Sequence, residues 1–235
     1  MELKVNQEQI DRLYRFTREH FVEHYDLQTE LVDHLSNAIE QQWKENPKLS
    51  FEDALQKEFK KFGVFGFMDV VEQRQKALTK RYYGFVWRHF IEFFKLPKII
   101  ITISLIGILF ELLTIISFKK NFVMVLVFGF LTYFLFWQVK MYRNRKKQKL
   151  LNKKRWIMEE LIFQCGTGSA FPVMLQVLVH SLRADYNGVE NLGFQLFFSI
   201  FYVVTVIIFY ILIIIIPSKA EEYLNQTYPE YSFSN

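Results

Sequence analysis

Four long apolar stretches in the second half of the chain restrict its possible folds more than any other feature. A helix needs about twenty apolar residues to cross the hydrocarbon core of a membrane. Stretches of this kind run over residues 99–117, 122–139, 157–182 and 192–216. We therefore predict an integral membrane protein of the all-α class, in which residues 99–217 form a bundle of four transmembrane helices.

The third stretch is the least hydrophobic of the four. Its polar side chains are Glu159, Glu160, Gln164, Gln176 and His180. It also contains the run CGTGSAFP, with Gly166, Gly168, Ala170 and Pro172. Gly166 and Ala170 are spaced for close helix packing, whereas Pro172 can kink the helix and free a carbonyl beside a binding cavity. Both readings of this stretch stay open.

The loop charges predict the orientation of the spans. Nine lysines and arginines and no acidic residue lie between Lys140 and Arg155, in the loop after the second stretch. Short loops of this kind stay on the cytoplasmic side. With four spans, both termini, including the tail at 218–235, are then expected in the cytoplasm of a bacterium, with the protein in its inner membrane. The same loop is expected to attract anionic lipid headgroups.

The net charge of +5 does not by itself indicate nucleic acid as a partner. The basic residues are concentrated beside the apolar stretches, where topology and lipid attraction account for them. Aromatic residues do not interleave with them in the pattern that stacks bases. We expect the lipid bilayer as a partner and no nucleic acid.

Several kinds of chemistry lack a sequence signature. Cys165 is the only cysteine, so neither an intrachain disulfide nor a cysteine-only zinc site can form. There is no phosphate-binding loop, GxSxG, HExxH or dinucleotide fingerprint. The polar N-terminus, MELKVNQEQIDR, is unlike a cleavable signal peptide, so the first span is expected to direct insertion. We expect no enzyme activity, cofactor or metal.

Residues 1–80 predict a small helical domain, here called the head. An apolar stripe at steps of four consists of Leu27, Leu31, Leu35, Ile39 and Trp43. Asn46 and Pro47 end that helix. Ser50 is expected to cap the next helix together with Asp53, and Gly63 suits its end. We therefore expect a small cytoplasmic helical bundle ahead of the spans.

Residues 81–98 form a juxtamembrane segment that is rich in aromatic and basic side chains, with YYGFVWRHFIEFF at 82–94. A segment of this composition can lie in the headgroup plane as an amphipathic helix. It can equally continue the preceding helix and pack against the head. The sequence leaves both possibilities open.

Two groups of residues in the head form a recognisable pattern. The first group is Glu30, Leu31, Asp33, His34 and Leu35, and the second is Ser50, Glu52, Asp53, Ala54, Leu55, Phe62 and Gly63. Over residues 25–75 this pattern resembles the HAAS-type, permease-prefix-like helical domain of bacterial multi-span membrane proteins. In that family the domain precedes hydrophobic spans and is often linked with PadR-like regulators or transporter permeases. The resemblance implies a regulatory or sensory role and no catalytic residues, although residues 64–66 depart from it where a proline is common.

Glu30, Asp33 and His34 are the candidate partner-binding residues of the head. They could form a hydrogen-bonded group between helices, and an unperturbed histidine titrates near neutral pH. His20 and His24 have the i, i+4 spacing of a two-histidine metal face. Surface or packing histidines explain that spacing as well, so we predict no metal site there.

Glu111 is the candidate functional residue within the membrane. It lies about six residues, or roughly 9 Å, from the outer end of the first span. A carboxylate in hydrocarbon costs a few kcal/mol unless it faces the bundle, finds a partner or is neutralised. Glu111 could therefore be a ligand or proton site, or it could snorkel to the interface or pair with Lys119 or Lys120.

These features favour a non-enzymatic membrane protein with a regulatory or signalling role, whose cytoplasmic head binds a protein partner or another copy of the chain. The alternative is a small transporter or permease-like component that uses Glu111 and the kinked third span. A membrane enzyme acting on lipid is a third hypothesis, for which only Glu111 and the histidines offer chemistry.

Overall fold

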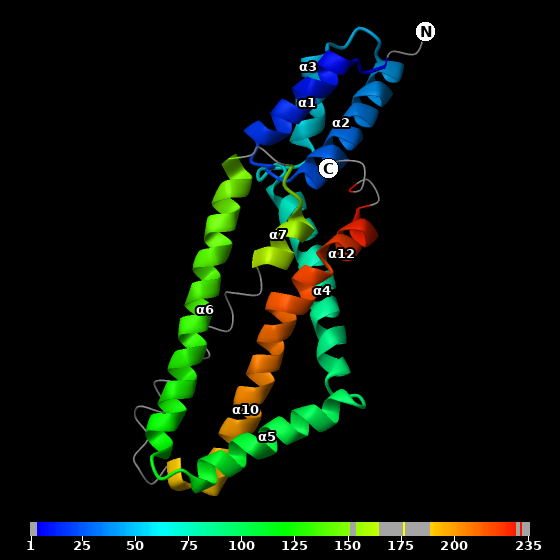
Figure 1. Cartoon of the computed structure of the whole chain (residues 1–235). Coiled ribbons are helices and arrows are strands. Elements are labelled where there is room, and N and C mark those ends of the chain that lie inside the picture. Colours follow the sequence, from blue (N-terminus) through cyan, green and yellow to red (C-terminus); the bar gives the residue numbers. More distant parts are fainter. Residues whose placement is uncertain (1–3, 151–153, 165–175, 177–188, 229–230, 232–235) are drawn as a thin grey trace. The chain divides into compact units, whose positions relative to one another are not determined.

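The computed structural model describes residues 4–150, 154–164, 176, 189–228 and 231, and every regular element among them is helical. Figure 1 shows the elements in chain order. They are α1 (Gln7–Glu19), α2 (Tyr25–Glu45), α3 (Phe51–Lys60), α4 (Met68–Glu92), α5 (Lys98–Ile115), α6 (Lys119–Leu150), α7 (Ile157–Gln164), α10 (Leu192–Tyr210), a π-helical turn (Ile211–Ile215), α11 (Ile216–Ser218) and α12 (Ala220–Thr227). The prediction of an all-α chain is confirmed for these residues.

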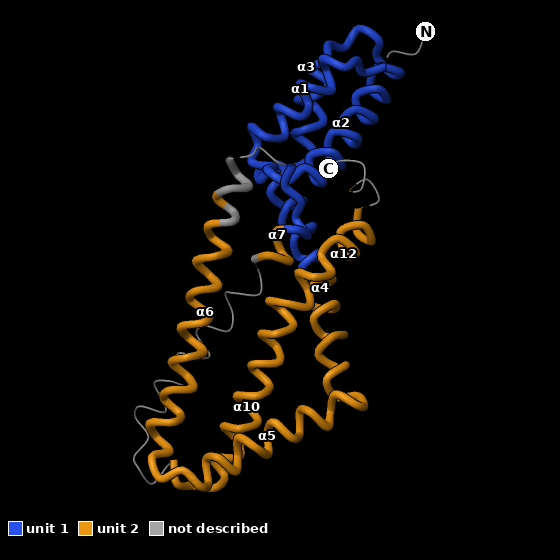
Figure 2. Tube along the Cα trace, in the orientation of Figure 1, with its two compact units in different colours: residues 1–80, 154–159 blue, residues 81–153, 160–235 orange. Residues whose placement is uncertain are grey.

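The chain divides into two compact units (Figure 2). The head unit comprises Met1–Lys80 together with Lys154–Glu159. The second unit, here called the span unit, comprises Arg81–Lys153 and Glu160–Asn235. Two helices, α4 and α7, therefore contribute residues to both units.

The apolar stripe predicted for residues 27–43 is buried along its whole length in the head unit. Helix α2, which carries it, packs against α1 and α3. Leu13 and Phe16 of α1 and Ala54 and Leu55 of α3 are also buried. Burial of such side chains is the main favourable term in folding, so the three helices form one apolar core.

Side-chain caps fix where the helices of the head begin. Asn6 and Gln9 form a capping box at the start of α1, in which each side chain accepts a hydrogen bond from the other residue's backbone amide. At the start of α3, the Ser50 hydroxyl accepts a 3.2 Å hydrogen bond from the Asp53 amide, as the sequence indicated. These caps satisfy amides that have no partner within the helix.

Two glycines with left-handed backbone shape the connection between α3 and α4. Gly63 has φ of +75° and Gly66 has φ of +54°. Residues with a Cβ rarely adopt these angles. The turn ends α3 and leads into α4, which then continues without a break from Met68 to Glu92. The juxtamembrane residues 81–92 therefore belong to the same helix as residues 68–80.

Residues 154–159, which follow the basic loop, return to the head unit. The amide of Tyr25 donates a 2.7 Å hydrogen bond to the carbonyl of Arg155, and Arg155 forms an ion pair with Glu23. Trp156 is buried, with its ring 5.4 Å from that of Tyr25. The third predicted span begins at residue 157, whereas Ile157 and Met158 are buried in the head unit.

Three helices in the described residues are long and apolar enough to cross a membrane: Lys98–Ile115, Lys119–Arg143 and Leu192–Ser218. They correspond to the first, second and fourth predicted spans. Most of the predicted third span lies outside the described residues, including Gly166, Gly168, Ala170 and Pro172. Three of the four predicted spans therefore have a helix of suitable length and composition.

Aromatic contacts connect the long helices of the span unit. The rings of Phe130 on α6 and Phe209 on α10 lie 4.7 Å apart, and the Tyr202 hydroxyl donates a 3.3 Å hydrogen bond to the Leu126 carbonyl. Helix α5 also packs against α10. Elsewhere the three helices expose many large apolar side chains, as lipid-facing surfaces do.

Candidate functional site

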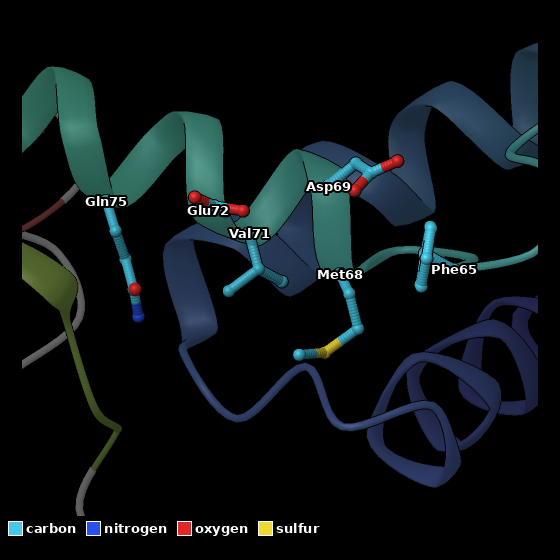
Figure 3. Close-up of a pocket in the computed structure, with 6 residues that line it drawn as sticks. All are labelled: Phe65, Met68, Asp69, Val71, Glu72 and Gln75. Atoms are coloured by element: carbon cyan, nitrogen blue, oxygen red, sulfur yellow. The ribbon is translucent and has the colours of Figure 1, made fainter.

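A groove of about 550 Å³ opens at the start of α4 in the head unit (Figure 3). Its lining consists of Phe65, Met68, Asp69, Val71, Glu72 and Gln75. The preceding turn explains why apolar side chains lie at the surface here. Gly63 and Gly66, both with left-handed backbone, flank Val64 and Phe65, and these two side chains are 98% and 70% exposed.

The groove combines an apolar lining with acidic side chains. Phe65, Met68 and Val71 supply apolar surface, and methionine adapts its shape to different partners. Asp69 and Glu72 add carboxylates to the lining. The hydrogen bond and charge of Lys76, 2.6 Å from Glu72, hold the pKa of that carboxyl below its ordinary value. This chemistry suits a partner with apolar anchors beside basic residues.

The three residues predicted to bind a partner are all exposed on α2, where their spacing of three and four positions puts Glu30, Asp33 and His34 on one helical face. Glu30 is exposed and lies 3.6 Å from a guanidinium nitrogen of Arg74. Asp33 is exposed, and its backbone carbonyl accepts a hydrogen bond from Ser36. His34 is largely exposed, with Nε2 at 3.7 Å from a carboxylate oxygen of Glu58.

Glu58 was not identified from the sequence, although its carboxylate is enclosed within the head and forms ion pairs there. It is 4% exposed, accepts a 3.2 Å hydrogen bond from Gln42 and pairs with Lys61 at 2.6 Å. The available signal was its position, because Glu58 follows Ala54 and Leu55 by four and three residues on the apolar face of α3.

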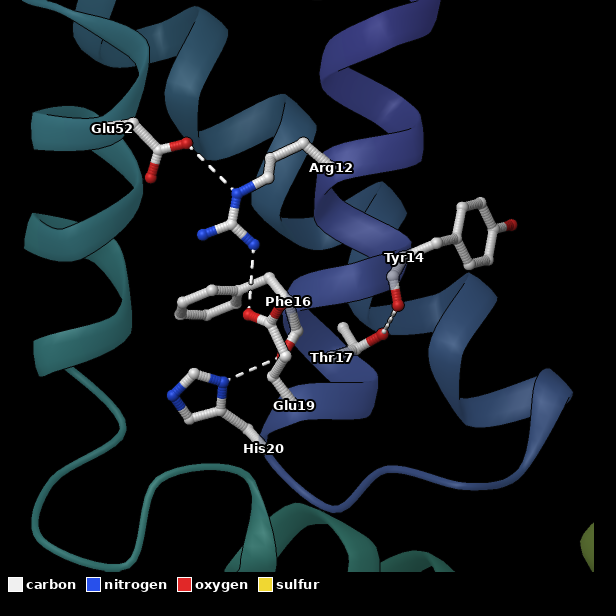
Figure 4. Close-up of polar contacts among 7 residues, drawn as sticks. All are labelled: Arg12, Tyr14, Phe16, Thr17, Glu19, His20 and Glu52. Atoms are coloured by element: carbon white, nitrogen blue, oxygen red, sulfur yellow. Dashed lines mark hydrogen bonds and ion pairs between the residues drawn. The ribbon is translucent and has the colours of Figure 1, made fainter.

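The end of α1 uses its polar residues for structure (Figure 4). Arg12 contacts the carboxylates of Glu19 and Glu52, each at 3.2 Å. The His20 Nδ1 lies 2.8 Å from the Phe16 carbonyl, and its ring lies against the rings of Phe16 and Phe59. Its role is therefore aromatic packing at the end of the helix.

His24 occupies a different structural position, the N-cap of α2. The i, i+4 spacing of the two histidines thus bridges a turn between helices and does not mark one helical face. Among the residues that the structure describes, no group of three or more His, Cys, Asp or Glu side chains could hold a metal ion.

Glu111 lies on an exposed face of α5, within the first candidate span. Its backbone carbonyl accepts a 2.8 Å hydrogen bond from Thr114. Lys119 is one of the two lysines considered as ion-pair partners of Glu111, and in the structure it pairs with Glu190 at 2.6 Å. The described residues therefore do not enclose Glu111 in a cavity.

A second polar cluster joins α4 to α12 in the span unit. His89 and Tyr223 are both buried, and the histidine Nε2 lies 2.6 Å from the tyrosine hydroxyl. The Tyr223 ring stacks on Phe85 at 4.1 Å. Arg81 donates a 3.0 Å hydrogen bond to the carbonyl of Gln226 in the last turn of α12. The tail predicted from residue 218 onward thus contains a helix that is fixed to the juxtamembrane segment.

The charges around this cluster shift two pKa values. Burial raises the pKa of Tyr223, and the nearby charge of Glu222 raises it further. Burial also acts to raise the pKa of Glu92, but His89 and Lys98 outweigh it and bring that pKa below its ordinary value. Their nitrogens both lie 3.4 Å from a Glu92 carboxylate oxygen.

The geometry thus presents one open groove on the head and one enclosed polar cluster on the span unit. Comparison with known proteins adds no relative to these observations, since the chain matches no protein-family model, no curated protein and no solved structure.

Proposed function

We propose that this chain is a non-enzymatic integral membrane protein whose helical head binds a protein partner in the cytoplasm, in a regulatory or signalling role. The observation that carries the proposal is the groove at the start of α4 with its exposed apolar side chains. Large apolar surfaces that remain exposed commonly mark interaction sites. The groove is proposed to take a segment with apolar anchors and neighbouring basic residues.

The membrane arrangement is part of the proposal. Four spans, including one across residues 157–182, would place both termini and the basic loop at 140–155 in the cytoplasm. That loop would lie against anionic lipid headgroups. The resemblance of residues 25–75 to HAAS-type domains supports a regulatory role for the head.

A photo-crosslinking amino acid at position 65 of the full chain, in living cells, tests the groove. We expect a discrete protein adduct that Met68→Ser weakens, because Met68 lines the same groove. The matched control places the crosslinker at Lys57, an exposed residue of α3. Identical adducts from both positions, or an adduct at position 65 that is insensitive to Met68→Ser, would contradict the proposal.

A topology reporter fused after residue 235 tests the membrane arrangement separately. Reporter activity on the cytoplasmic side is expected, and activity on the opposite side would exclude four spans with both ends inside. The transporter alternative depends on Glu111 and the third span. Glu111 lies on an exposed face of α5 in the described structure, so the head offers the stronger basis for a function.

A further inference from the structure

The last turns of α4 present two chemically different faces. Tyr82, Phe85 and His89 are buried, and the latter two contact Tyr223 of α12. Residues three and four apart share one face of a helix. Tyr83, Trp87 and Ile91 follow one another at steps of four positions and so share a face as well. At about 3.6 residues per turn, this face lies opposite to the one formed by Tyr82, Phe85 and His89.

The outward face is aromatic and exposed. Trp87 is 60% exposed, Tyr83 is 51% exposed, and Ile91 and Phe94 are exposed as well. The rings of Trp87 and Phe90 lie 5.5 Å apart and those of Phe90 and Phe94 lie 5.0 Å apart, so they form a continuous aromatic row. Tryptophan and tyrosine are enriched where membrane meets water because their rings combine apolar bodies with polar tips.

The charges beside this face are basic. Arg88 and Lys95 are exposed at its edge. Glu92 is the only acidic residue between positions 80 and 95, and it is paired with Lys98 and contacts His89. A surface of this kind is complementary to negatively charged headgroups.

Contacts within the span unit show that this segment runs past the end of the last candidate span. His89 contacts Tyr223, which follows Ser218 by five residues, whereas Phe93 contacts a residue within the span. The Phe93 ring lies 6.3 Å from that of Tyr210. Tyr210 is eight residues before Ser218, the end of the last candidate span. At the rise of an α-helix this is about 12 Å inside the span. Helix α5, the first candidate span, then begins at Lys98, a few residues after Phe93.

We propose that Tyr83, Trp87, Ile91 and Phe94 form a lipid-binding face that lies in the headgroup region, where Arg88 and Lys95 bind anionic phospholipid. The position of this segment at the end of the last candidate span and its short connection to α5 favour lipid over a protein as the occupant. This face is separate from the groove of the head and does not depend on the head's partner. The contact with α12 on the opposite side holds the face toward the membrane.

Spin labels on the full chain test the location of the face. With Cys165→Ser as background, one label is placed by Tyr83→Cys, Trp87→Cys or Ile91→Cys, and Lys57→Cys on α3 serves as the control. The protein is reconstituted in vesicles of phosphatidylcholine and phosphatidylglycerol. Collisions with molecular oxygen report lipid, and collisions with a water-soluble nickel chelate report water.

We expect labels at positions 87 and 91 to collide more with oxygen and less with the nickel chelate than the label at position 57. The ratio of oxygen collisions to nickel collisions should rise from position 83 to position 91. Nickel collisions equal to those at position 57 would overturn the proposal, because the face would then be in water. Exclusion of both reagents would overturn it too, since a protein, including a second copy of this chain, would then cover the face.

The anionic preference has its own test. A bimane at position 87, quenched by brominated phosphatidylglycerol or brominated phosphatidylcholine, reports the local ratio of the two lipids. We expect phosphatidylglycerol to be enriched around position 87. In the double variant Arg88→Gln, Lys95→Gln, this enrichment should fall about fivefold for each charge removed. Lys57→Gln with Lys60→Gln, on α3, should leave the ratio unchanged. A local ratio equal to that of the bulk membrane in the unsubstituted chain would overturn the preference.

Discussion

The Nε2 atom of His89 on α4 lies 2.6 Å from the hydroxyl oxygen of Tyr223 on α12, and both side chains are buried. The Nδ1 atom of the same ring lies 3.4 Å from the Glu92 carboxylate, which can only accept a hydrogen bond. When the ring is neutral, Nδ1 therefore donates to Glu92 and Nε2 accepts from the Tyr223 hydroxyl. This chain of contacts connects α12 to α4, the helix that precedes the first candidate span.

Removing the hydroxyl by Tyr223→Phe should loosen α12 while keeping its aromatic stacking on Phe85. The buried nitrogen of His89 loses its partner, which costs about 1–3 kcal/mol. Backbone amides at 220–228 should then exchange hydrogen about fivefold to a hundredfold faster, as measured by mass spectrometry on the full chain. Tyr83→Phe, on the exposed face of α4, is the control and should leave the exchange of these amides unchanged. Unaltered exchange in Tyr223→Phe would show that the hydrogen bond is not needed for docking.

Acid should weaken the same contact through Glu92. Its pKa in the folded chain lies below the ordinary value of 4.5, so the folded state favours the ionised carboxylate. The stabilisation is present above pH 4.5 and is lost as the pH falls through the lower folded pKa. The melting temperature of the full chain should therefore fall in acid, and Glu92→Gln should reduce this fall. An identical pH profile in both proteins would exclude Glu92 as its source.

The two glycines before α4 should differ in their response to alanine. Both have positive φ, which costs an alanine about 1–2 kcal/mol. A Cβ at Gly66 would also lie 2.9 Å from the Phe59 ring, whereas a Cβ at Gly63 meets nothing within 4 Å. Gly66→Ala should therefore lower the melting temperature of the full chain more than Gly63→Ala. Equal effects would indicate that Phe59 moves aside without cost.

Replacing Glu111 by leucine should stabilise the chain in lipid. The carboxylate lies on an exposed face of α5, and an acidic residue at the centre of a span costs about 2.5–3.5 kcal/mol. Since Glu111 lies nearer the end, we expect a gain of about 1–2 kcal/mol, measured as a higher melting temperature in nanodiscs. The melting temperature of Glu111→Gln should lie between those of the unsubstituted chain and Glu111→Leu. A lower melting temperature in Glu111→Leu would reveal a partner for the carboxylate and would favour a functional role.

The helices of the head could be predicted because their signals are local. The stripe from Leu27 to Trp43 and the cap at Ser50 each depend on residues within one or two turns, and both are present in the structure. The spans at 99–117, 122–139 and 192–216 follow from length and apolarity alone.

The candidate sites were harder to predict because they depend on contacts between distant segments. Glu30 and His34 share one face of α2, but Glu30 lies beside Arg74 and His34 lies beside Glu58, two residues that are distant from them in sequence. Aromatic residues occur on all sides of the segment from 82 to 94, so the pattern could not separate the two faces of α4. The contacts of Phe85 and His89 with Tyr223, which is distant in sequence, distinguish the two faces.

The return of residues 154–159 to the head unit sets an order of events during synthesis. The ribosome must produce α5 and α6 before Arg155 and Trp156 exist to cover Tyr25. The head is therefore completed only after both helices have been translated. A chain that stalls or is cut before residue 154 would therefore carry a head in which Tyr25 lacks its contacts with Arg155 and Trp156.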